Sequence, residues 1–468
     1  ICVLIIIFFS SISCYSIDLQ EEINMKFGTM KTVSSVFLTS LFVIGTLFTT
    51  SVYAKDRIKV GVVSFLTGPA GGPFGIPAKQ GAELVIDAIN AGTMPAPYNK
   101  KGFAGATLDA IYSDESGGGT KQVALFRDFV QKQNVDAMIG YISSGNCMAI
   151  GPVADELKML TVFSTCGTPR LYEEKLRSHV FRTQANAVGD SLAAAKYIAD
   201  EYFKGKMTTA GKMYTGINQN YAWGQDSYKF FELGMKVYMP SAVGSSKPQF
   251  PKLFAGQYGT EISALSLDKA KVVHSSFWNG DWEAFVLQAM VRGFFKQKIV
   301  VSSVGGSAVD TLGKKFPDGV IMGTRGLVGL NVRDNKDPLN TWFVSEYKKR
   351  YKAWPLGPSY QYARSVMAYK LAMDKAAASA GKFPTQDQVI SAMKGMKFKS
   401  FVDTIEFTRG GGHQAVHAIS YGITKYNKAK GEPEVENLKT YAASCIYPPA
   451  GVKSEDWINN GMPGRKCE

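Results

Sequence analysis

Short strand-like runs alternate with helix-like stretches through most of this 468-residue chain, and this alternation limits the folds open to it. The pattern begins at residues 57–63, whose β-branched side chains are typical of a strand buried on both faces. A Gly/Pro-rich loop follows at residues 67–76, and apolar residues then recur at helical spacing up to Asn90. Strands that alternate with helices predict βαβ units and a parallel sheet, so the expected fold class is α/β.

The alternation runs through two successive series, which predicts two lobes. Further strand-like runs of the first series lie at residues 107–112, 137–141 and 160–164. After His179 a second series begins, with strand-like runs at residues 212–215, 272–275 and 299–302. We expect lobe 1 to contain residues 55–180 and 330–405, lobe 2 to contain residues 181–329 and 406–440, and residues 441–468 to form a C-terminal tail.

The first 54 residues read as a leader and not as part of the fold. Residues 25–54 combine a positive start, an apolar stretch and a small-residue motif that ends at Ala54, which is typical of a cleaved secretory signal peptide. Residues 1–24 do not begin with Met and are interpreted as mis-annotated upstream sequence. We therefore expect an exported, soluble, periplasmic protein that begins at Lys55, with a retained membrane anchor as the alternative.

The composition favours a globular protein with a small acidic ligand. Hydrophobic residues make up 45% and charged residues 20% of the chain, and the formal net charge is +14. The lysines are spread along expected helix faces, and no basic run with interleaved aromatics occurs, so we expect no nucleic-acid partner. A positive charge of this size favours attraction of acidic small molecules, with simple solubility as the alternative.

The motifs of common enzymes and cofactor sites are missing from the sequence. Neither a G-x-S-x-G nucleophile elbow nor a G-x-x-x-x-G-K-[ST] phosphate loop occurs. His413 and His417 have the spacing of a helical metal site, but the residues around them read as a Gly-rich turn and a strand. We expect no catalytic residues, no metal and no cofactor. An exported hydrolase stays open as a less favoured class.

Four cysteines follow the expected cleavage site: Cys147, Cys166, Cys445 and Cys467. An even number in an exported protein predicts disulfides, and four cysteines allow three connectivities. Proximity in the sequence favours pairing of Cys147 with Cys166 and of Cys445 with Cys467.

Hydroxyl side chains follow two neighbouring strands of the first series. Ser143 and Ser144 open a helix, and Gly167 and Thr168 follow the next strand along the chain. The carboxyl ends of parallel strands face a common ligand crevice, and a helix N-terminus attracts anions. These loops are therefore expected to hold a carboxylate, with ordinary helix capping as the alternative.

The corresponding loops of the second series are aromatic. Tyr221 and Trp223 precede one helix, and Phe277 and Trp278 follow the strand that ends near Ser275. Aromatic side chains in loops at strand ends are typical of a ligand wall. Packing against the neighbouring helix is the alternative for each of them.

An ordered series of segments resembles the periplasmic binding proteins of branched-chain amino acid ABC transporters, the Leu/Ile/Val-binding type. The segments are IKVGVVSFLTGPAGGPFG, DAMIGYISSGN, PVADELKMLTVFSTCGTPRL, FRTQANAVGDSLAAAKYI and NQNYAWGQD. The resemblance implies two Rossmann-like lobes joined by a three-segment hinge that closes on a ligand. It also implies a monomer that delivers a small molecule to the membrane permease of an ABC importer. A sensory protein of the same fold is the alternative.

The resemblance also assigns positions in the site. It implies ligand contacts at Phe74, Ser144, Gly167, Thr168, Trp223 and Trp278. The chain departs from the family around Ser303, where amino-acid binders place a glutamate that pairs with the ligand ammonium. An unpaired ammonium in a buried site would be costly. We therefore expect Ser303 to lie in a site for a non-amino carboxylate, aromatic or aliphatic, with a true amino acid or amide ligand as the alternative.

Overall fold

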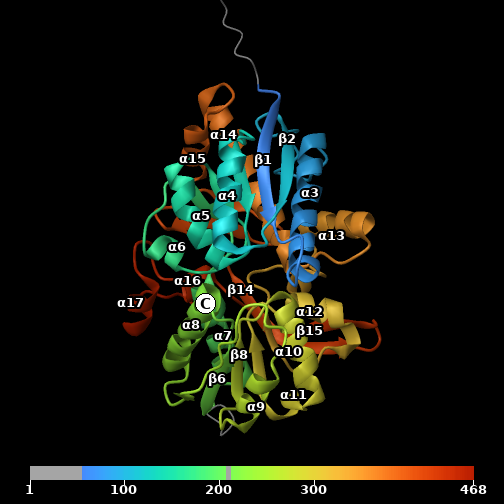
Figure 1. Ribbon diagram of the computed structural model, residues 1–468, viewed down its shortest axis with the longest axis vertical. Helices are drawn as coiled ribbons and strands as arrows, with labels where there is room; N and C mark the ends of the chain where they lie inside the picture. The colour runs from blue at the N-terminus through green and yellow to red at the C-terminus, as the bar shows by residue number, and fades with distance from the viewer. Residues whose placement is uncertain (1–54, 207–211, 468) are drawn as a thin grey trace, which may run out of the picture. The chain divides into compact units, whose positions relative to one another are not determined.

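The computed structural model describes residues 55–206 and 212–467. The expected upstream segment 1–24 and the expected signal peptide 25–54 lie outside these residues. Two mainly parallel sheets, with helices on both faces of each, form the described chain (Figure 1). This arrangement confirms the α/β class and the two Rossmann-like lobes expected from the sequence.

The first sheet has eight strands in the order β11-β12-β13-β5-β4-β3-β1-β2. Six neighbouring strands, from β13 to β2, are parallel, whereas β11 and β12 are antiparallel to their neighbours. The strands are β1 (Arg57–Ser64), β2 (Thr107–Asp114), β3 (Ala137–Gly140), β4 (Thr161–Phe163), β5 (Val180–Arg182), β11 (Lys397–Lys399), β12 (Thr404–Arg409) and β13 (Gln414–Val416).

Helices cover both faces of the first sheet because alternate strand residues point to opposite sides. Val60 and Val62 of β1 pack in the cluster that contains α3 and α14, whereas Val63 packs with α4 and α5. The helices are α3 (Ile76–Ala91), α4 (Gly118–Gln131), α5 (Ser144–Glu156), α6 (Arg170–Glu173), α13 (Pro338–Tyr351), α14 (Gly357–Ala380) and α15 (Gln386–Met393), and a π-helical turn, η1 (Gly71–Gly75), precedes α3.

The second sheet has seven strands in the order β15-β14-β10-β9-β8-β6-β7. The strands are β6 (Met213–Ile217), β7 (Val243–Gly244), β8 (Val272–Ser275), β9 (Ile299–Ser302), β10 (Ile321–Gly323), β14 (Ile419–Asn427) and β15 (Glu432–Tyr441). Its helical elements are α7 (Ala187–Tyr197), η2 (Ile198–Tyr202), α8 (Ala222–Tyr238), α9 (Gly259–Leu267), α10 (Asn279–Val291), α11 (Phe294–Gln297), α12 (Gly306–Leu312), η3 (Gly313–Lys315) and η4 (Gly329–Val332).

The chain passes between the two sheets three times, after β5, after β10 and after β13. From the sequence we expect residues 406–440 in lobe 2, whereas β12 and β13 pair within the first sheet. The reason is the turn at Gly410–Gly412, which folds β13 back on β12 and brings Gln414 beside Arg182 of β5. The last passage between sheets therefore lies after Val416.

The C-terminal tail packs on the fold through two short helices, α16 (Ala443–Ile446) and α17 (Ser454–Asn459). Trp457 of α17 is buried, and α17 contacts α8, as Figure 1 also shows. None of the helices in residues 55–206 and 212–467 combines the length and apolar character that a membrane span requires.

Candidate functional site

Loops from both sheets meet around one small cluster of side chains. Six of the residues expected in the site lie together there: Phe74, Ser144, Gly167, Tyr221, Trp223 and Trp278. Four others complete the lining: Ile142, Thr165, Val304 and Arg325. The volume left free between them is only about 10 Å³, room for about one water molecule. The two lobes thus meet tightly at this point.

The hydroxyl of Ser144 joins the two loops of the first lobe. Its Oγ accepts hydrogen bonds from the backbone N–H groups of Gly167, at 3.0 Å, and Thr168, at 3.2 Å. Because both bonds use the oxygen, the hydroxyl proton stays available as a donor. Thr165 on the same loop is buried, and its Oγ1 has no hydrogen-bond partner within the described chain. This wall therefore offers hydroxyl donors.

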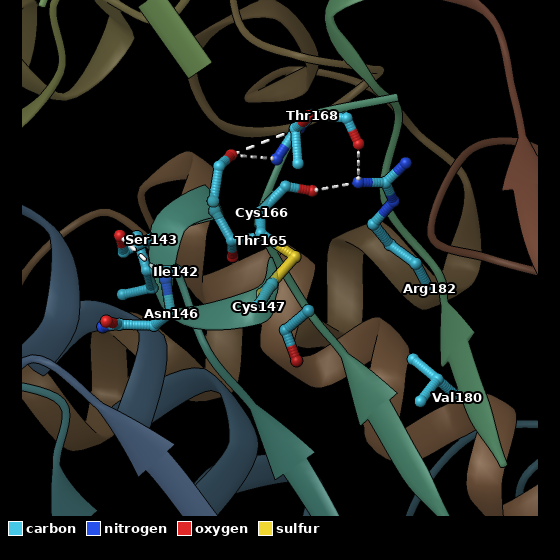
Figure 2. The surroundings of a disulfide bond; sticks show 12 residues. Ile142, Ser143, Asn146, Cys147, Thr165, Cys166, Thr168, Val180 and Arg182 are labelled. Atoms are coloured by element: carbon cyan, nitrogen blue, oxygen red, sulfur yellow. Dashed lines mark hydrogen bonds between the residues drawn. A yellow bond between two sulfur atoms is a disulfide. The ribbon is translucent and has the colours of Figure 1, made fainter. Parts of the chain in front are cut away.

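A disulfide connects these two loops of the first lobe. Cys147 of α5 is bonded to Cys166 in the loop after β4, and both residues are fully buried (Figure 2). The bond ties the helix that begins at Ser144 to the loop that carries Gly167. A second disulfide, between Cys445 and Cys467, joins α16 to the end of the tail.

The opposite wall is aromatic, and hydrogen bonds fix its orientation. The indole N–H of Trp223 donates to the carbonyl oxygen of Ser276, and that of Trp278 donates to the hydroxyl oxygen of Tyr221, each at 2.9 Å. Burial raises the pKa of Tyr221, so its hydroxyl keeps its proton and can donate it in a hydrogen bond. Phe74 of the first lobe meets Trp278 edge to face, with ring centroids 5.2 Å apart.

Arg325 places a positive charge in the cluster. Its Nε donates to Oδ2 of Asp190 at 3.0 Å, and its two terminal nitrogens donate to the carbonyl oxygens of Thr165 and Ala185 at 2.6 and 2.7 Å. The guanidinium carbon lies 4.4 Å from the ring centroid of Trp223. Each terminal nitrogen keeps one further N–H, because a guanidinium has five in all. Burial raises the pKa of Asp190 to about 6, although the cationic Arg325 opposes this shift.

Arg325 is not among the site residues expected from the sequence. The sequence does carry a signal, because residue 325 lies two residues after the end of β10, and ligand contacts gather at strand ends. Gly167 shows how closely the cluster is packed. A Cβ atom at this position would overlap the ring of Trp223 and come within 2.7 Å of Nη2 of Arg325.

Two of the expected hydroxyl residues lie beside the cluster and make other bonds. Ser143 is the N-cap of α5, where its Oγ accepts from the N–H of Asn146. Thr168 donates its hydroxyl to Oδ2 of Asp226 at 2.6 Å, and Arg170 forms an ion pair with the same carboxylate at 2.7 Å. Since Asp226 belongs to α8 of the second lobe, these contacts join the lobes at the edge of the site.

Two expected second-lobe residues also face away from the cluster. Phe277 is fully buried and packs on Tyr258, with ring centroids 5.0 Å apart, so it belongs to the core. Ser303 is buried within hydrogen-bond distance of the imidazole of His274, at 3.0 Å, and of the Tyr421 hydroxyl, at 3.2 Å. Both lie next to loop residues that do line the site.

None of the ten residues that line the cluster is acidic. Glu115, the carboxyl behind the α5 loop, is fully buried and accepts hydrogen bonds from the backbone N–H groups of Ile142 and Ser143 at 2.7 and 2.8 Å. The side-chain amide of Asn146 donates to it at 3.0 Å. Burial raises the pKa of Glu115 to about 8, while these hydrogen bonds oppose the shift. These hydrogen bonds tie Glu115 to the start of α5 and the residues before it.

The described residues contain no group of three His, Cys, Asp or Glu side chains that could hold a metal ion. His413 stacks on Phe181, with ring centroids 4.2 Å apart, and Nε2 of His417 accepts from the backbone N–H of Ala185 at 2.8 Å. Both histidines are buried near the passages between the sheets, where they serve packing and hydrogen bonding.

A family model described as "Periplasmic binding protein" matches residues 57–430 of the chain. A search of curated protein sequences returns no significant match.

Solved structures share the fold at low sequence identity. A solute binding protein of an ABC transporter from Rhodopseudomonas palustris BisB5, in complex with 3,4-dihydroxybenzoic acid, is 19% identical, with a TM-score of 0.69 over 83% of this chain and 98% of that chain. An R. palustris solute binding protein in complex with 4-hydroxybenzoate is 18% identical, with a TM-score of 0.68 over the same shares. An ABC-type branched-chain amino acid transporter protein from R. palustris CGA009 is 19% identical, with a TM-score of 0.62 over 88% of this chain and 100% of that chain.

Proposed function

Because the chain belongs to the periplasmic binding protein family, with a family match over residues 57–430, we propose that it captures a small carboxylate between its lobes for an ABC importer. The family match supports a solute-binding role and implies an extracytoplasmic location. The ligand we propose is a non-amino acid with an aromatic ring. Delivery to a membrane permease is part of the same proposal.

The burial of the Arg325 cation in the lining is the observation that carries the proposal. Two N–H groups of Arg325 are not used by the bonds it makes to the protein. A carboxylate accepts such donors in charge-assisted hydrogen bonds. The hydroxyl groups of Ser144 and Thr165 lie in the same lining and can donate as well. This set of donors favours an anionic group.

The rest of the lining favours an aromatic ring. Phe74, Trp223 and Trp278 present ring faces and edges, and Ile142 and Val304 add aliphatic surface. Aromatic pairs gain from edge-to-face and offset stacking beyond the area that they bury. Because the free volume is small, we expect the lobes to part when the ligand enters and to close on it.

The absence of acidic side chains from the described lining argues against an α-amino acid. An ammonium group buried there would meet Arg325 and no carboxylate, which costs several kcal/mol. The ligands of the solved relatives agree with this preference, because two of the proteins named above hold hydroxylated benzoic acids and a further R. palustris relative holds benzoate.

Calorimetric titration of the purified protein with four matched compounds tests the proposal. Benzoate carries the charge and the ring, benzamide removes the charge, cyclohexanecarboxylate removes the aromaticity, and phenylalanine adds the ammonium group. We expect benzoate to bind most tightly, cyclohexanecarboxylate less tightly, and the other two at least about tenfold more weakly than benzoate. Tight binding of phenylalanine without any binding of benzoate would contradict the proposed ligand class.

A further inference from the structure

The C-terminal tail leaves lobe 2, contacts lobe 1 and returns to lobe 2. Its first helix, α16, packs on α7, and its last helix, α17, packs on α8. The disulfide between Cys445 and Cys467 joins the two ends of this segment. Beside it, Ser444 and Lys466 make two hydrogen bonds to each other, each of 3.0 Å. Residues 445–467 are therefore a closed loop, here called the tail loop, whose base lies on lobe 2.

Buried side chains attach the base of the tail loop to lobe 2. Trp457 and Ile458 of α17 are buried. A Cβ atom at Gly189 of α7 would come within 2.3 Å of the ring of Tyr447, so this tyrosine packs directly on the helix. Figure 1 shows α16 and α17 at the height where the two lobes meet. The base of the tail loop must therefore move with lobe 2.

The middle of the tail loop is bonded to lobe 1. Arg409, at the end of β12, donates to the carbonyl oxygens of Pro448 and Val452, each at 2.8 Å. Glu173 of α6 pairs with Arg409 at 3.0 Å and accepts from the backbone N–H of Ser454, at 3.2 Å, and from its hydroxyl. Arg409 and Ser454 are buried, so water competes little for these bonds.

Away from these bonds the tail loop is not packed tightly on lobe 1. A cavity of about 600 Å³ lies between residues 450–453, α6 and the turn between β12 and β13. Residues 449–453 are exposed. The contact with lobe 1 is thus concentrated at Arg409 and Glu173, and a small set of polar bonds can break and form again as the lobes move.

We propose that the tail loop restrains the opening of the two lobes, through its bonds to Arg409 and Glu173. Because the base moves with lobe 2, lobes that part must pull the middle of the loop away from lobe 1 and break these bonds. The tail loop therefore favours the closed form of the protein before any ligand binds, and it slows the exit of a bound ligand.

The direct contact between the lobes lies on the same side of the molecule. Asp226 of α8, which is bonded to Thr168 and Arg170 of lobe 1, lines one surface hollow together with Glu173 and Glu455. The tail loop and Asp226 therefore resist the same movement. The inference rests on the proposed function only where it concerns ligand release, because lobe opening can be measured without a ligand.

Small-angle X-ray scattering of the ligand-free protein tests the proposal. We expect the wild-type profile to match the closed structure. Arg409→Gln/Glu173→Gln removes the charges of the contact and should raise the ratio of open to closed protein by about tenfold, with a larger radius of gyration. Ser454→Ala changes only the tail side of the contact, and it should raise the ratio by about threefold.

Two controls separate this restraint from a general loss of structure. Ser444→Ala removes a serine bond at the base of the tail loop, and Arg127→Gln/Glu156→Gln removes an Arg–Glu pair between α4 and α5 of lobe 1. Both should leave the scattering profile unchanged. If circular dichroism shows that Arg409→Gln/Glu173→Gln does not fold, Ser454→Ala decides.

Stopped-flow release of benzoate gives a second readout, which should quicken in the same order as the scattering changes. Scattering changes in a protein that binds no benzoate would support the restraint and count against the proposed ligand alone. An open wild-type profile, or profiles and release rates that are equal in wild type and in the folded variants at Arg409, Glu173 and Ser454, would overturn the proposal.

Discussion

The guanidinium of Arg325 lies over the indole ring of Trp223, 4.4 Å from its centroid. A cation above a tryptophan face is attracted by the ring electrons, and the attraction grows as water is excluded. The pair joins a residue that follows β10 to the first turn of α8. Through this contact the proposed anion-binding group and the aromatic wall of the candidate site form one unit.

Removal of the Arg325 charge should abolish the preference for carboxylates. The double variant Arg325→Gln/Asp190→Asn removes both charges of the ion pair and leaves no buried carboxylate alone. A charge-assisted hydrogen bond contributes about 1.5–3 kcal/mol, so calorimetry should find benzoate binding weakened by about 10- to 100-fold. Benzamide affinity should change little.

The matched control is another ion pair of an arginine with an aspartate, Arg177 with Asp155, which does not line the site. Arg177→Gln/Asp155→Asn should lower stability and keep benzoate affinity. Equal loss of benzoate affinity in both double variants would show that the effect of Arg325 is a general loss of structure.

Two neighbouring serines should separate ligand binding from helix capping. Ser144→Ala removes the acceptor for the N–H groups of Gly167 and Thr168, so it should weaken benzoate binding about fivefold or more and lower stability by about 1–3 kcal/mol. Ser143→Ala removes only the N-cap of α5 and should cost about 1 kcal/mol of stability at unchanged affinity. Titration calorimetry and urea unfolding measure the two quantities, and the reverse pattern would place the ligand nearer to Ser143.

Contacts of Asp226 should help to keep the lobes closed. Asp226→Asn weakens its bonds to Thr168 and Arg170, the two first-lobe residues that it joins. We expect faster benzoate release in stopped-flow experiments and a larger radius of gyration in small-angle scattering, because the open form becomes more populated. Asp200→Asn, which affects an ion pair within the second lobe, is the control and should change neither measurement.

The buried carboxyl of Glu115 should make stability depend on pH. Its pKa is raised from 4.5 to about 8, mainly by burial. Between these values the unfolded chain releases the proton while the folded protein keeps it, so stability should fall as the pH rises through this window, by up to a few kcal/mol. Urea unfolding from pH 5 to pH 8 should show this slope in wild type and a smaller one in Glu115→Gln. Equal slopes in both would contradict the raised pKa.

The two disulfides should differ in what they protect. Cys147→Ser/Cys166→Ser should cost about 3 kcal/mol of stability, and it should also weaken benzoate binding because it frees the loop of Gly167 from α5. The bond between Cys445 and Cys467 closes a similar length of chain but lies in the tail. Cys445→Ser/Cys467→Ser should therefore cost stability at unchanged affinity. Equal affinity in both double variants would show that the loop holds its position without the bond.

Periodicity in the sequence was enough to predict the two sheets and their helices, because strands buried on both faces and amphipathic helices leave direct patterns. The hairpin of β12 and β13 depends on a pairing with β5 more than 200 residues away, which no local pattern reveals. Within the site, position at a strand end predicts which loops meet. It does not predict side-chain direction, so Trp278 lines the cluster while its neighbour Phe277 lies in the core.

Arg325 and Thr168 show a further limit. The bonds that define each of them, to Asp190 and to Asp226, come from segments far apart in the sequence. A hydroxyl in a loop can face a ligand, cap a helix or join two lobes, and only the tertiary partners distinguish these uses. The charge of Arg325 was visible in the sequence, but its burial was not.

Two of the six tryptophans of the chain, Trp223 and Trp278, stand in the candidate cleft with their indole N–H groups held by fixed partners. Indole emission responds to the polarity and the charges around the ring. A molecule that enters between the lobes and displaces the contact of Arg325 with Trp223 will therefore change the intrinsic fluorescence of the protein. These two tryptophans are intrinsic fluorescent probes of ligand binding in the candidate cleft, so ligands can be screened without any attached dye.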